Sequence, residues 1–472
     1  MDGSITTRST NRRQFLTRYL PGGTLCGLVA AGVLASTEKK AGDAAAPFDS
    51  ASAAAGGPTA RTFEQMLERY ADVVVKVGLN LRARQRLLIV QAPIESPALV
   101  RQIAISAYKA GARFVDVVWR DQQMDLVRFQ HAPRDSFQES PDWPVSASLE
   151  YLNRGDANLV FLAEDPDLLN GQDPKLVAAA AQAGAQKLHP VMNHIARSST
   201  NWLAIGAAVE GWSAKVFPNL PPEQQQMRLW EAIFRVCRLN NPDPVSAWRD
   251  HVAGLQARCA YLDRKHYTGL KYTAPGTDLT VGLPDAHVWK GGRLTSQNGI
   301  AFVPNMPTEE VFTLPHKDRV EGVVCASKPL SYQGTLIEDF GFKVSQGRVV
   351  EVTASKGKEL LENLVKNVDG ACRFGEVSLV PNSSPISQSG ILFYNALIDE
   401  NAASHIALGA AYRFTLQGGE TMSAEEFAAA GGNESLEHVD FMMGSDKMAV
   451  DGILASGATE PIMRDGEWTF SV

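Results

Sequence analysis

The stretch HVDFMM, residues 438–443, places a histidine and an aspartate two positions apart in a run that reads as a β-strand. Side chains at i and i+2 of a strand project from the same face, so His438 and Asp440 are predicted to point together. A neutral imidazole beside a carboxylate suits a borderline divalent metal ion. The alternative is that Asp440 only orients a structural histidine. The spacing alone leaves both interpretations open.

A second candidate stretch, DENAASHIALGAAY, runs from Asp399 to Tyr412. If its central part is helical, His405 and Tyr412 lie two turns apart on one face, and Glu400 can fold toward the same side. Equally, Asp399 can be an N-cap and Glu400 a first-turn acid that complements the helix dipole, with no metal at all. The spacing of Glu400 and His405 is not that of the HExxH zinc-protease helix. By itself, this stretch favours the interpretation without a metal.

Carboxylates also stand in two other segments of the second half. The stretch PNMPTEEVFTLP (304–315) carries Glu309 and Glu310 between prolines, and FGEVSLV (374–380) carries Glu376. Glu376 enters an apolar run that reads as a buried strand. A carboxylate in such a place is costly unless it is paired or bound to a metal.

Together the four segments supply six candidate ligands, which are Glu310, Glu376, Glu400, His405, His438 and Asp440. One metal ion needs three or four such ligands. Six are therefore enough for two ions that share a bridging carboxylate, typically about 3.5–4 Å apart in hydrolases. Such a pair can activate a water and polarise a carbonyl, so the predicted chemistry is metal-assisted hydrolysis.

The composition is that of a globular protein, with 44% hydrophobic and 21% charged residues among 472. That length suggests two to four domains. The formal net charge is −7 and no stretch is strongly basic, so the electrostatic signature of nucleic-acid binding is missing. The 5 cysteines are scattered without a CxxC pair, which excludes a zinc ribbon or a CxxC redox motif.

The elements that must position these residues divide the chain at about residue 245. Residues 61–245 alternate helical and strand patterns, with strands predicted at RLLIVQAP, RFVDVVW and ANLVFLAE, and this alternation predicts an α/β domain with a parallel sheet. No GxGxxG follows the first strand, so a dinucleotide site has no support. Residues 246–472 carry short β-like runs between glycine and proline turns after a long helical stretch. They predict an α+β domain with mainly antiparallel strands.

Residues 1–60 are predicted to be an export signal followed by an Ala/Gly/Ser-rich linker. Arg12 and Arg13 precede a short apolar run, Thr24 to Ala35, and an Ala/Gly/Ser-rich stretch follows. The apolar run is too short to span a bilayer, which takes about 20 residues, and the whole segment resembles a twin-arginine export signal. A disordered basic N-terminus is the alternative. The expectation is an exported, periplasmic or extracytoplasmic protein without a membrane span in its mature form, with a cytoplasmic location as the alternative.

Long runs in the chain resemble the M29 family of metallo-aminopeptidases. The runs are PGTDLTVGLP, FVPNMPTEEVFTLP, GEVSLV followed by SPI, DENAASHIALGAAY and HVDFMMGS in the second half, and YADVVVKVGLNL, AYKAGA and VVWRD in the first. They occur in the family's order and cover essentially everything from about residue 62 onward. The one departure is the leader, because members of the family are commonly intracellular.

The resemblance implies roles for individual residues. The metal ligands would be Glu310, Glu376, Glu400, His405, His438 and Asp440. Glu376 would also be the general base, and the Tyr412 hydroxyl would stabilise the tetrahedral oxyanion. The adjacent Glu309 could exchange roles with Glu310, but in a strand the two would face opposite sides, so only one should reach the site.

The resemblance also implies a function. Such an enzyme releases N-terminal residues from short peptides with two divalent ions per chain, whether zinc, cobalt, manganese or magnesium. It is typically a homodimer, and residues 61–245 contribute to the dimer and shield the catalytic cavity formed in residues 246–472. Two alternatives stay open at this point: a two-metal amidase or esterase acting on a non-peptide substrate, and a non-catalytic exported binding protein with the same fold.

Overall fold

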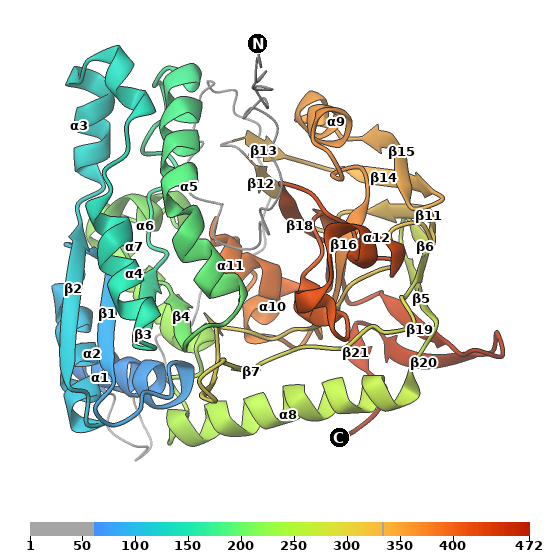
Figure 1. Cartoon of the computed structure of the whole chain (residues 1–472), viewed down its shortest axis with the longest axis horizontal. Helices are drawn as coiled ribbons and strands as arrows, with labels where there is room; N and C mark the ends of the chain where they lie inside the picture. Colours follow the sequence, from blue (N-terminus) through green and yellow to red (C-terminus); the bar gives the residue numbers. More distant parts are fainter. Residues whose placement is uncertain (1–60, 333–334) are drawn as a thin grey trace, which may run out of the picture.

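The computed structural model of the chain describes residues 61–332 and 335–472, which form two halves side by side (Figure 1). The predicted export signal, residues 1–60, lies outside the described residues. Across the part of the chain that is described, no helix is both long enough and apolar enough to cross a membrane.

The N-terminal half is built on a five-stranded sheet in the order β2-β1-β3-β4-β9, and every neighbouring pair in it is parallel. Its strands are β1 (Arg86–Pro93), β2 (Phe114–Arg120), β3 (Ala157–Phe161), β4 (Trp202–Ile205) and β9 (Asn305–Met306). The three strands expected from RLLIVQAP, RFVDVVW and ANLVFLAE are confirmed. A parallel sheet with helices around it was also the predicted architecture, and it is confirmed for this half.

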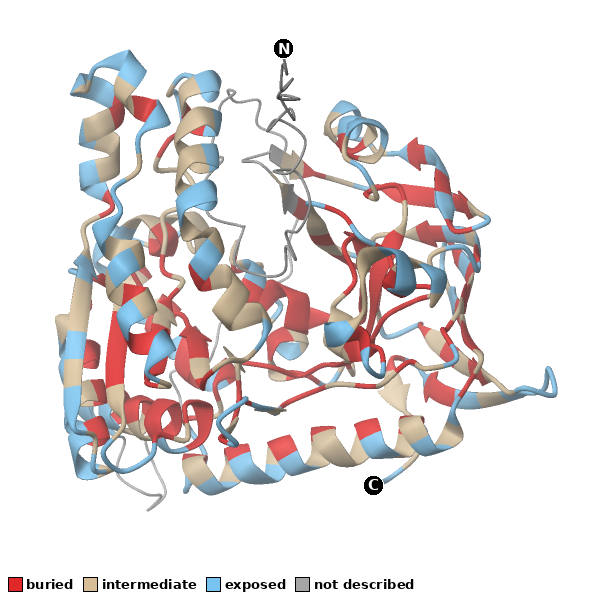
Figure 2. Cartoon of the chain, in the orientation of Figure 1, coloured by how far each residue is buried: buried red, intermediate tan, exposed pale blue. Residues whose placement is uncertain are grey.

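Helices surround this sheet and bury its apolar side chains (Figures 1 and 2). Their bounds are α1 (Phe63–Val73), a π-helical continuation η1 (Val74–Gly78), α2 (Pro97–Lys109), α3 (Gln123–His131), a 3-10 turn η2 (Arg134–Gln138), α4 (Trp143–Asn153), α5 (Pro174–Ala196), α6 (Glu210–Val216) and α7 (Pro222–Val236). A capping box starts the first of them, because Thr62 and Gln65 each accept a hydrogen bond from the other's backbone N–H.

Two connections tie the halves together. Strand β9 belongs by sequence to the second half, but its Asn305 and Met306 pair with Ala204 and Ile205 of β4. Helix α8 (Pro244–Lys265) runs beneath both halves (Figure 1). Asp243 caps it by accepting the backbone N–H groups of Val245 and Ser246.

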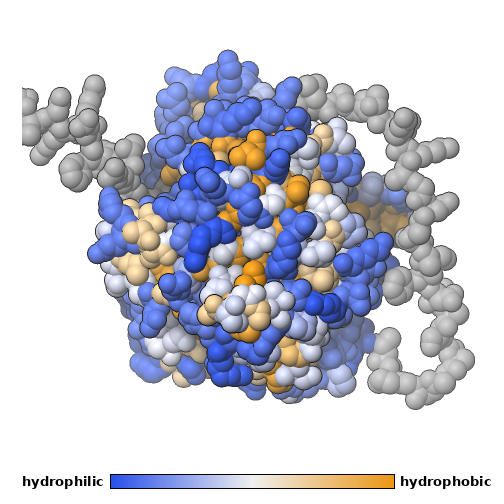
Figure 3. Space-filling model, turned by 90° about the vertical axis from the view of Figure 1, so that its right-hand side faces the viewer, coloured by the Kyte–Doolittle hydropathy of each residue, from blue (hydrophilic) through white to orange (hydrophobic). Residues whose placement is uncertain are grey.

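The C-terminal half contains an eight-stranded sheet in the order β15-β14-β11-β6-β5-β19-β20-β21, with antiparallel neighbours throughout. Its strands are β5 (Gly269–Ala274), β6 (Thr277–Gly282), β11 (Val320–Cys325), β14 (Gly341–Ser345), β15 (Arg348–Thr353), β19 (Ala449–Ile453), β20 (Thr459–Arg464) and β21 (Glu467–Trp468). The prediction of mainly antiparallel strands is therefore confirmed. Figure 3 views the molecule from the side of this sheet, where the surface is mostly hydrophilic around an apolar band.

A four-stranded antiparallel sheet, in the order β10-β16-β17-β18, packs within the same half. Its strands are β10 (Val311–Thr313), β16 (Phe374–Leu379), β17 (His405–Gly409) and β18 (His438–Met442). Alternate residues of its three longer strands, among them Val377, Ile406 and Phe441, enter the same hydrophobic core as the eight-stranded sheet. The opposite face of this small sheet carries the candidate site.

The remaining elements of the C-terminal half are short. They are β7 (Leu294–Thr295), β8 (Ala301–Phe302), β12 (Leu330–Tyr332), β13 (Thr335–Ile337), α9 (Lys358–Asn367), α10 (Pro385–Ser389), α11 (Ala396–Asp399), α12 (Ala424–Ala429) and the 3-10 turns η3 (Glu400–Ala402), η4 (Arg413–Thr415) and η5 (Gly419–Thr421). Side chains of α10, α11 and η3 pack into the core of the N-terminal half. The segment that carries Glu400 is thus held between the two halves.

Candidate active site

The pleat of the four-stranded sheet gathers polar side chains on one face. Glu376 of β16 lies opposite Ala407 of β17, and Ala407 lies opposite Asp440 of β18. Since side chains alternate along a strand, His405 and His438 share this face with Glu376 and Asp440. The small residue Ala407 in the central strand leaves room between the acidic side chains on either side.

Four of these side chains approach one another closely. His405 Nε2 lies 3.4 Å from Glu376 Oε1, and His438 Nε2 lies 3.7 Å from Glu376 Oε2. His438 Nε2 also lies 3.3 Å from Asp440 Oδ1, so the prediction that His438 and Asp440 point together is confirmed. Glu376 thus lies between the two histidines, with one carboxylate oxygen toward each.

Glu310 joins this cluster from the residue before β10. Its Oε2 lies 3.2 Å from His405 Nε2 and accepts a hydrogen bond of 2.9 Å from the Ser378 hydroxyl. Glu376 and Ser378 are two residues apart in β16, so they share the face that carries the site. The hydroxyl of Ser378 therefore fixes the orientation of the Glu310 carboxylate.

The adjacent Glu309 points away from the cluster. Its carboxylate forms a two-pronged ion pair with Arg238, and Oε2 lies 3.7 Å from His251 Nε2. The expected opposite orientation of Glu309 and Glu310 is therefore observed, although both residues precede β10 instead of lying within it. His251, which had no predicted part, contacts the same segment through its Nε2, 2.8 Å from the Thr308 carbonyl oxygen.

The stretch from Asp399 to Tyr412 is not helical through its centre, and that hypothesis was wrong. Helix α11 ends at Asp399, Glu400 opens the 3-10 turn η3, and His405 begins strand β17. The alternation of Ile406 and Leu408 with His405 and Ala407 decides the outcome, because the strand must pair with both β16 and β18. Asp399 does not cap a following helix either; its carboxylate accepts the backbone N–H groups of Phe393 and Asn395, which precede it.

Glu400 is buried and is held by its neighbour Asn401. The Asn401 amide nitrogen lies 3.4 Å from Glu400 Oε1, and its amide oxygen accepts the backbone N–H of Glu309 at 2.7 Å. Asn401 is fully buried and therefore connects the segment of Glu310 with that of Glu400. The residue was not singled out in the sequence, where its only signal is its place directly after Glu400.

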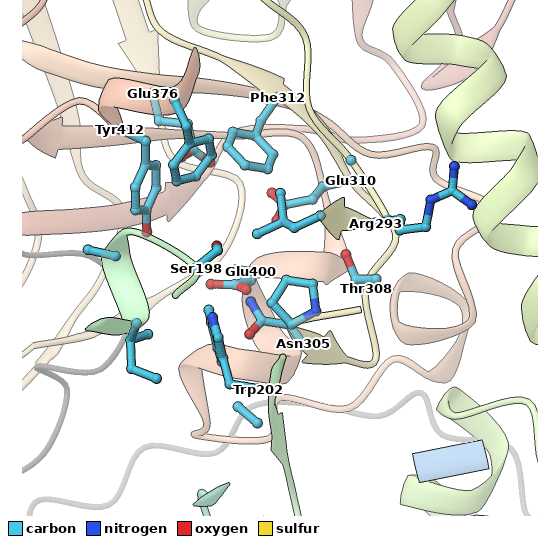
Figure 4. Close-up of a pocket in the computed structure, with 18 of the residues that line it drawn as sticks. Ser198, Trp202, Arg293, Asn305, Thr308, Glu310, Phe312, Glu376, Glu400 and Tyr412 are labelled. Atoms are coloured by element: carbon cyan, nitrogen blue, oxygen red, sulfur yellow. The ribbon is translucent and has the colours of Figure 1, made fainter. Parts of the chain in front are cut away.

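Tyr412 lies beyond the end of β17, beside the cluster. Its ring stacks on Phe414 with centroids 5.1 Å apart and lies 4.8 Å from the His438 ring. Figure 4 shows its hydroxyl oxygen pointing into the cavity that Glu310, Glu376 and Glu400 line.

That cavity has a volume of about 110 Å³ and lies between the two halves (Figure 4). One side carries the acidic and imidazole groups together with Tyr412. The other side is largely apolar and comes from the end of α5 and from β4, through Met192, Ile195, Ala196 and Trp202. The N-terminal half thus closes a cavity whose polar floor belongs to the C-terminal half.

Burial and mutual repulsion set the protonation of the acids. Burial, together with the charges of Glu310 and Asp440, raises the pKa of Glu376 to about 7. The same causes raise the pKa of Glu400 well above its ordinary value. Burial also raises the pKa of Asp440, but the neighbouring His438 and His405 outweigh it and lower the pKa of that group overall.

The neighbouring carboxylates set the direction in which the pKa values of the two histidines shift. Burial disfavours a charged imidazole, but Asp440 and Glu376 outweigh that effect and raise the pKa of His438 to about 9. Glu310 and Glu376 likewise raise the pKa of His405 well above its ordinary value. Without another cation, protons therefore supply the positive charge that this cluster of carboxylates requires.

The donor set fits divalent metal ions. Two groups of residues place ligand atoms within 4.8 Å of one another, namely Glu310, Glu376 and His405, and Glu376, His438 and Asp440. Asp440 Oδ1 is buried and lies near His438 without a hydrogen bond to any described residue. His405 Nδ1 faces the Ala403 carbonyl oxygen at 3.2 Å and His438 Nδ1 faces that of Ala410 at 2.7 Å, so both Nε2 atoms point into the cluster.

Replacing Glu309 with alanine is expected to destabilise the fold by about 3–5 kcal/mol, because it leaves the Arg238 guanidinium buried without its partner. The side chains of Arg238 and Glu309 are only 16% and 3% exposed. The measurement is the free energy of unfolding from urea titration. The matched control is Glu68→Ala, which removes a surface pair with Lys109 whose side chains are 55% and 63% exposed. A loss no larger than in that control would contradict the prediction.

The chain is similar in sequence to proteins of known activity. Residues 63–468 match the family described as "Thermophilic metalloprotease (M29)". Over 409 residues the chain is 44% identical to "Aminopeptidase AmpS" of Bacillus subtilis, covering 87% of this chain and 100% of that protein. It is 43% identical over 406 residues to "Aminopeptidase T" of Thermus thermophilus, covering 86% and 99% of the two chains.

The fold is also similar to a solved structure. Wild-type AmpT from Thermus thermophilus superposes with a TM-score of 0.82 at 42% identity, over 87% of this chain and 100% of that one. The similarity spans both halves and every segment of the cluster described above. The chain belongs to the M29 family and is a metallo-aminopeptidase.

Proposed function

We propose that this aminopeptidase works with two divalent ions per chain, held by Glu310, Glu376, Glu400, His405, His438 and Asp440. The observation that carries the proposal is that Glu376 belongs to both three-residue groups of ligand atoms. A carboxylate shared in this way would serve as a common ligand of two ions. Glu400 lies outside both groups but lines the same cavity, and it would complete the ligand set on one side.

Divalent ions bound there would polarise the scissile carbonyl and lower the pKa of a water molecule. Within the chain, Glu376 accepts the proton of that water and returns it to the leaving amine. The Tyr412 hydroxyl donates a hydrogen bond to the oxygen that becomes negative in the tetrahedral transition state. Zinc, cobalt, manganese and magnesium are the candidate ions.

Short peptides are the proposed substrates. The cavity of about 110 Å³ is closed on one side by the end of α5 and by β4, so a folded protein cannot reach the cluster, whereas the end of a peptide can. Cleavage of leucine anilide, but not of its N-acetyl derivative, tests the requirement for a free amine. Cleavage of the blocked substrate would instead indicate a broader amidase.

Metal binding is expected to release protons and to weaken as the pH falls. His405 and His438 both have a raised pKa in the metal-free site, about 9 for His438, so an ion must displace their protons. Apparent affinity should therefore fall about tenfold per pH unit below pH 9 for each proton displaced. Calorimetric titration of metal-free protein with zinc, in two buffers of different ionisation enthalpy, counts these protons. Affinity that does not vary with pH would place the ions elsewhere.

We also propose a homodimer formed through the N-terminal half. Strand β2 is at the edge of its sheet, and large apolar side chains stand exposed on it and on its neighbours α2 and α3. Their exposed fractions are 47% for Phe114, 44% for Trp119, 50% for Tyr108 and 60% for Met124. An edge strand with an apolar surface is a natural pairing site. Analytical ultracentrifugation should give twice the chain mass, and Phe114→Glu with Trp119→Glu should give the monomer. A monomeric wild type would rule the dimer out.

Export is the proposal for residues 1–60, supported by Arg12, Arg13 and the apolar run that follows them. These residues precede the part of the chain that matches the family. Fractionation of cells that express the full chain tests the proposal. Wild type should be found outside the cytoplasm, whereas Arg12→Lys with Arg13→Lys should remain inside. Cytoplasmic wild type would contradict it.

A further inference from the structure

Arg293 and Thr308 also line the catalytic cavity, but three other polar side chains outside the ligand cluster come from the N-terminal half or from its sheet. They are Ser198 after α5, Trp202 of β4 and Asn305 of β9. In Figure 4 Trp202 and Asn305 lie across the cavity from Glu376 and Phe312, and Ser198 lies between them and Tyr412, with polar atoms directed into the cavity. We call these three residues the donor wall.

Of the three residues of the donor wall, Trp202 gives the strongest indication of a ligand. Its indole Nε1 is buried and has no hydrogen-bond partner among the described residues. A buried N–H without an acceptor is rare, because leaving it unpaired costs about 1–3 kcal/mol. The ring itself is held by packing on Phe302, with centroids 6.0 Å apart, so the N–H cannot easily turn elsewhere. Because Trp202 lines the cavity, a ligand bound there can supply the acceptor.

Ser198 and Asn305 add donors beside Trp202. Ser198 has a φ of 46°, in the left-handed region that a serine seldom adopts, and such strain gathers at functional positions. Asn305 is fixed through its backbone, since it pairs with Ala204 in the parallel sheet. No side-chain hydrogen bond of either residue is found among the described residues, and both side chains line the cavity (Figure 4).

The chemistry of a peptide limits what the donor wall can hold. The free α-ammonium group offers only N–H donors, and an indole N–H is a donor only, so the N–H of Trp202 cannot bind it. The scissile carbonyl belongs beside the ligand cluster and Tyr412. The acceptors that remain are the oxygens beyond the scissile bond, either the next main-chain carbonyl or a terminal carboxylate.

We infer that the donor wall binds a carbonyl or carboxylate oxygen on the leaving side of the peptide, and so sets the preference for peptides over other amides. This inference rests on the proposed peptidase site. It gives the N-terminal half a direct part in substrate choice, because Ser198 and Trp202 come from that half and Asn305 is paired into its sheet.

The test compares three substrates that begin with leucine: the p-nitroanilide, Leu-Gly amide and Leu-Gly. The leaving group of the anilide has no carbonyl or carboxylate oxygen; its only oxygens belong to the nitro group on the far side of the ring. Trp202→Phe, which keeps an aromatic ring, should lower the ratio of kcat/KM on either dipeptide to kcat/KM on the anilide about tenfold. Asn305→Ala should lower the ratio in the same direction. Trp143→Phe, at a tryptophan that is 61% exposed on α4, is the matched control and should leave the ratio as in wild type.

The two sources of the acceptor separate in the same experiment. A larger loss on Leu-Gly than on its amide assigns the terminal carboxylate, and an equal loss assigns the carbonyl. An unchanged ratio in both variants overturns the inference, whether activity is retained on all three substrates or lost equally from all of them. Failure of the metal-loaded wild type to cleave any of the three would contradict the proposed peptidase function instead.

Discussion

Glu376→Gln is expected to lower kcat about 10³-fold. Glutamine keeps the size of the side chain and one of its oxygens, but it cannot accept the proton of the attacking water. It also removes the negative charge that faces His405 and His438 from either side. The measurement is steady-state hydrolysis of leucine anilide at saturating metal, with metal content determined on the same sample.

The metal content of Glu376→Gln separates the loss of a base from the loss of ions, and a distant variant is the control. Glu359→Gln, at an exposed first-turn acid of α9, makes the same chemical change far from the cavity and should keep full activity. If Glu376→Gln retains both ions but not turnover, the base is assigned. If it binds fewer ions, the bridging role accounts for part of the loss. Activity within tenfold of wild type would remove Glu376 from both roles.

The two site segments with clear strand alternation were predictable from sequence. In GEVSLV and HVDFMM, apolar residues alternate with polar ones, so the shared faces of His438 and Asp440 follow from the period alone. The same argument places Ser378 two residues from Glu376, on the face that carries the site. Its contact with Glu310 was therefore within reach of the sequence, although the residue was overlooked.

For the stretch from Asp399 to Tyr412, the local sequence pattern predicts the wrong secondary structure. Its alanines and the seven-residue spacing between His405 and Tyr412 suit a helix, and nothing local reveals that β16 and β18 lie on either side of it. Pairing with two neighbours overrides a weak local preference. The tertiary sheet, and not the spacing along the chain, brings Glu376 and His405 within 3.4 Å.

Contacts between distant segments were equally invisible in the sequence. Strand β9 is only two residues long, yet it extends a sheet whose neighbouring strand lies about a hundred positions earlier in the chain. The pairing carries Asn305 to the cavity and places Thr308, Glu309 and Glu310 between the two halves. Arg238, whose ion pair anchors that segment, follows α7 in the N-terminal half and carries no local mark of its role.

Tyr412→Phe is the second substitution for which we expect a large effect. It should lower kcat by about 10²–10³-fold and leave KM within about threefold of wild type. The hydroxyl is proposed to act on charge that develops only in the transition state, so its removal should hardly change binding of the ground state. Phenylalanine keeps the ring between Phe414 and His438, 5.1 Å and 4.8 Å away, so the walls of the cavity stay in place.

Whether Tyr412→Phe changes kcat or KM tests the proposal that the Tyr412 hydroxyl stabilises the oxyanion. Tyr261→Phe removes a hydroxyl from another stacked tyrosine, whose ring lies 3.9 Å from that of Phe470 at the far end of α8, and it should leave both constants as in wild type. A raised KM with an unchanged kcat in Tyr412→Phe would mean that the hydroxyl binds the substrate before reaction. Because Tyr412 reaches the cavity from the strand end opposite the α5 wall, a loss confined to kcat would place the developing charge between that hydroxyl and the ligand cluster.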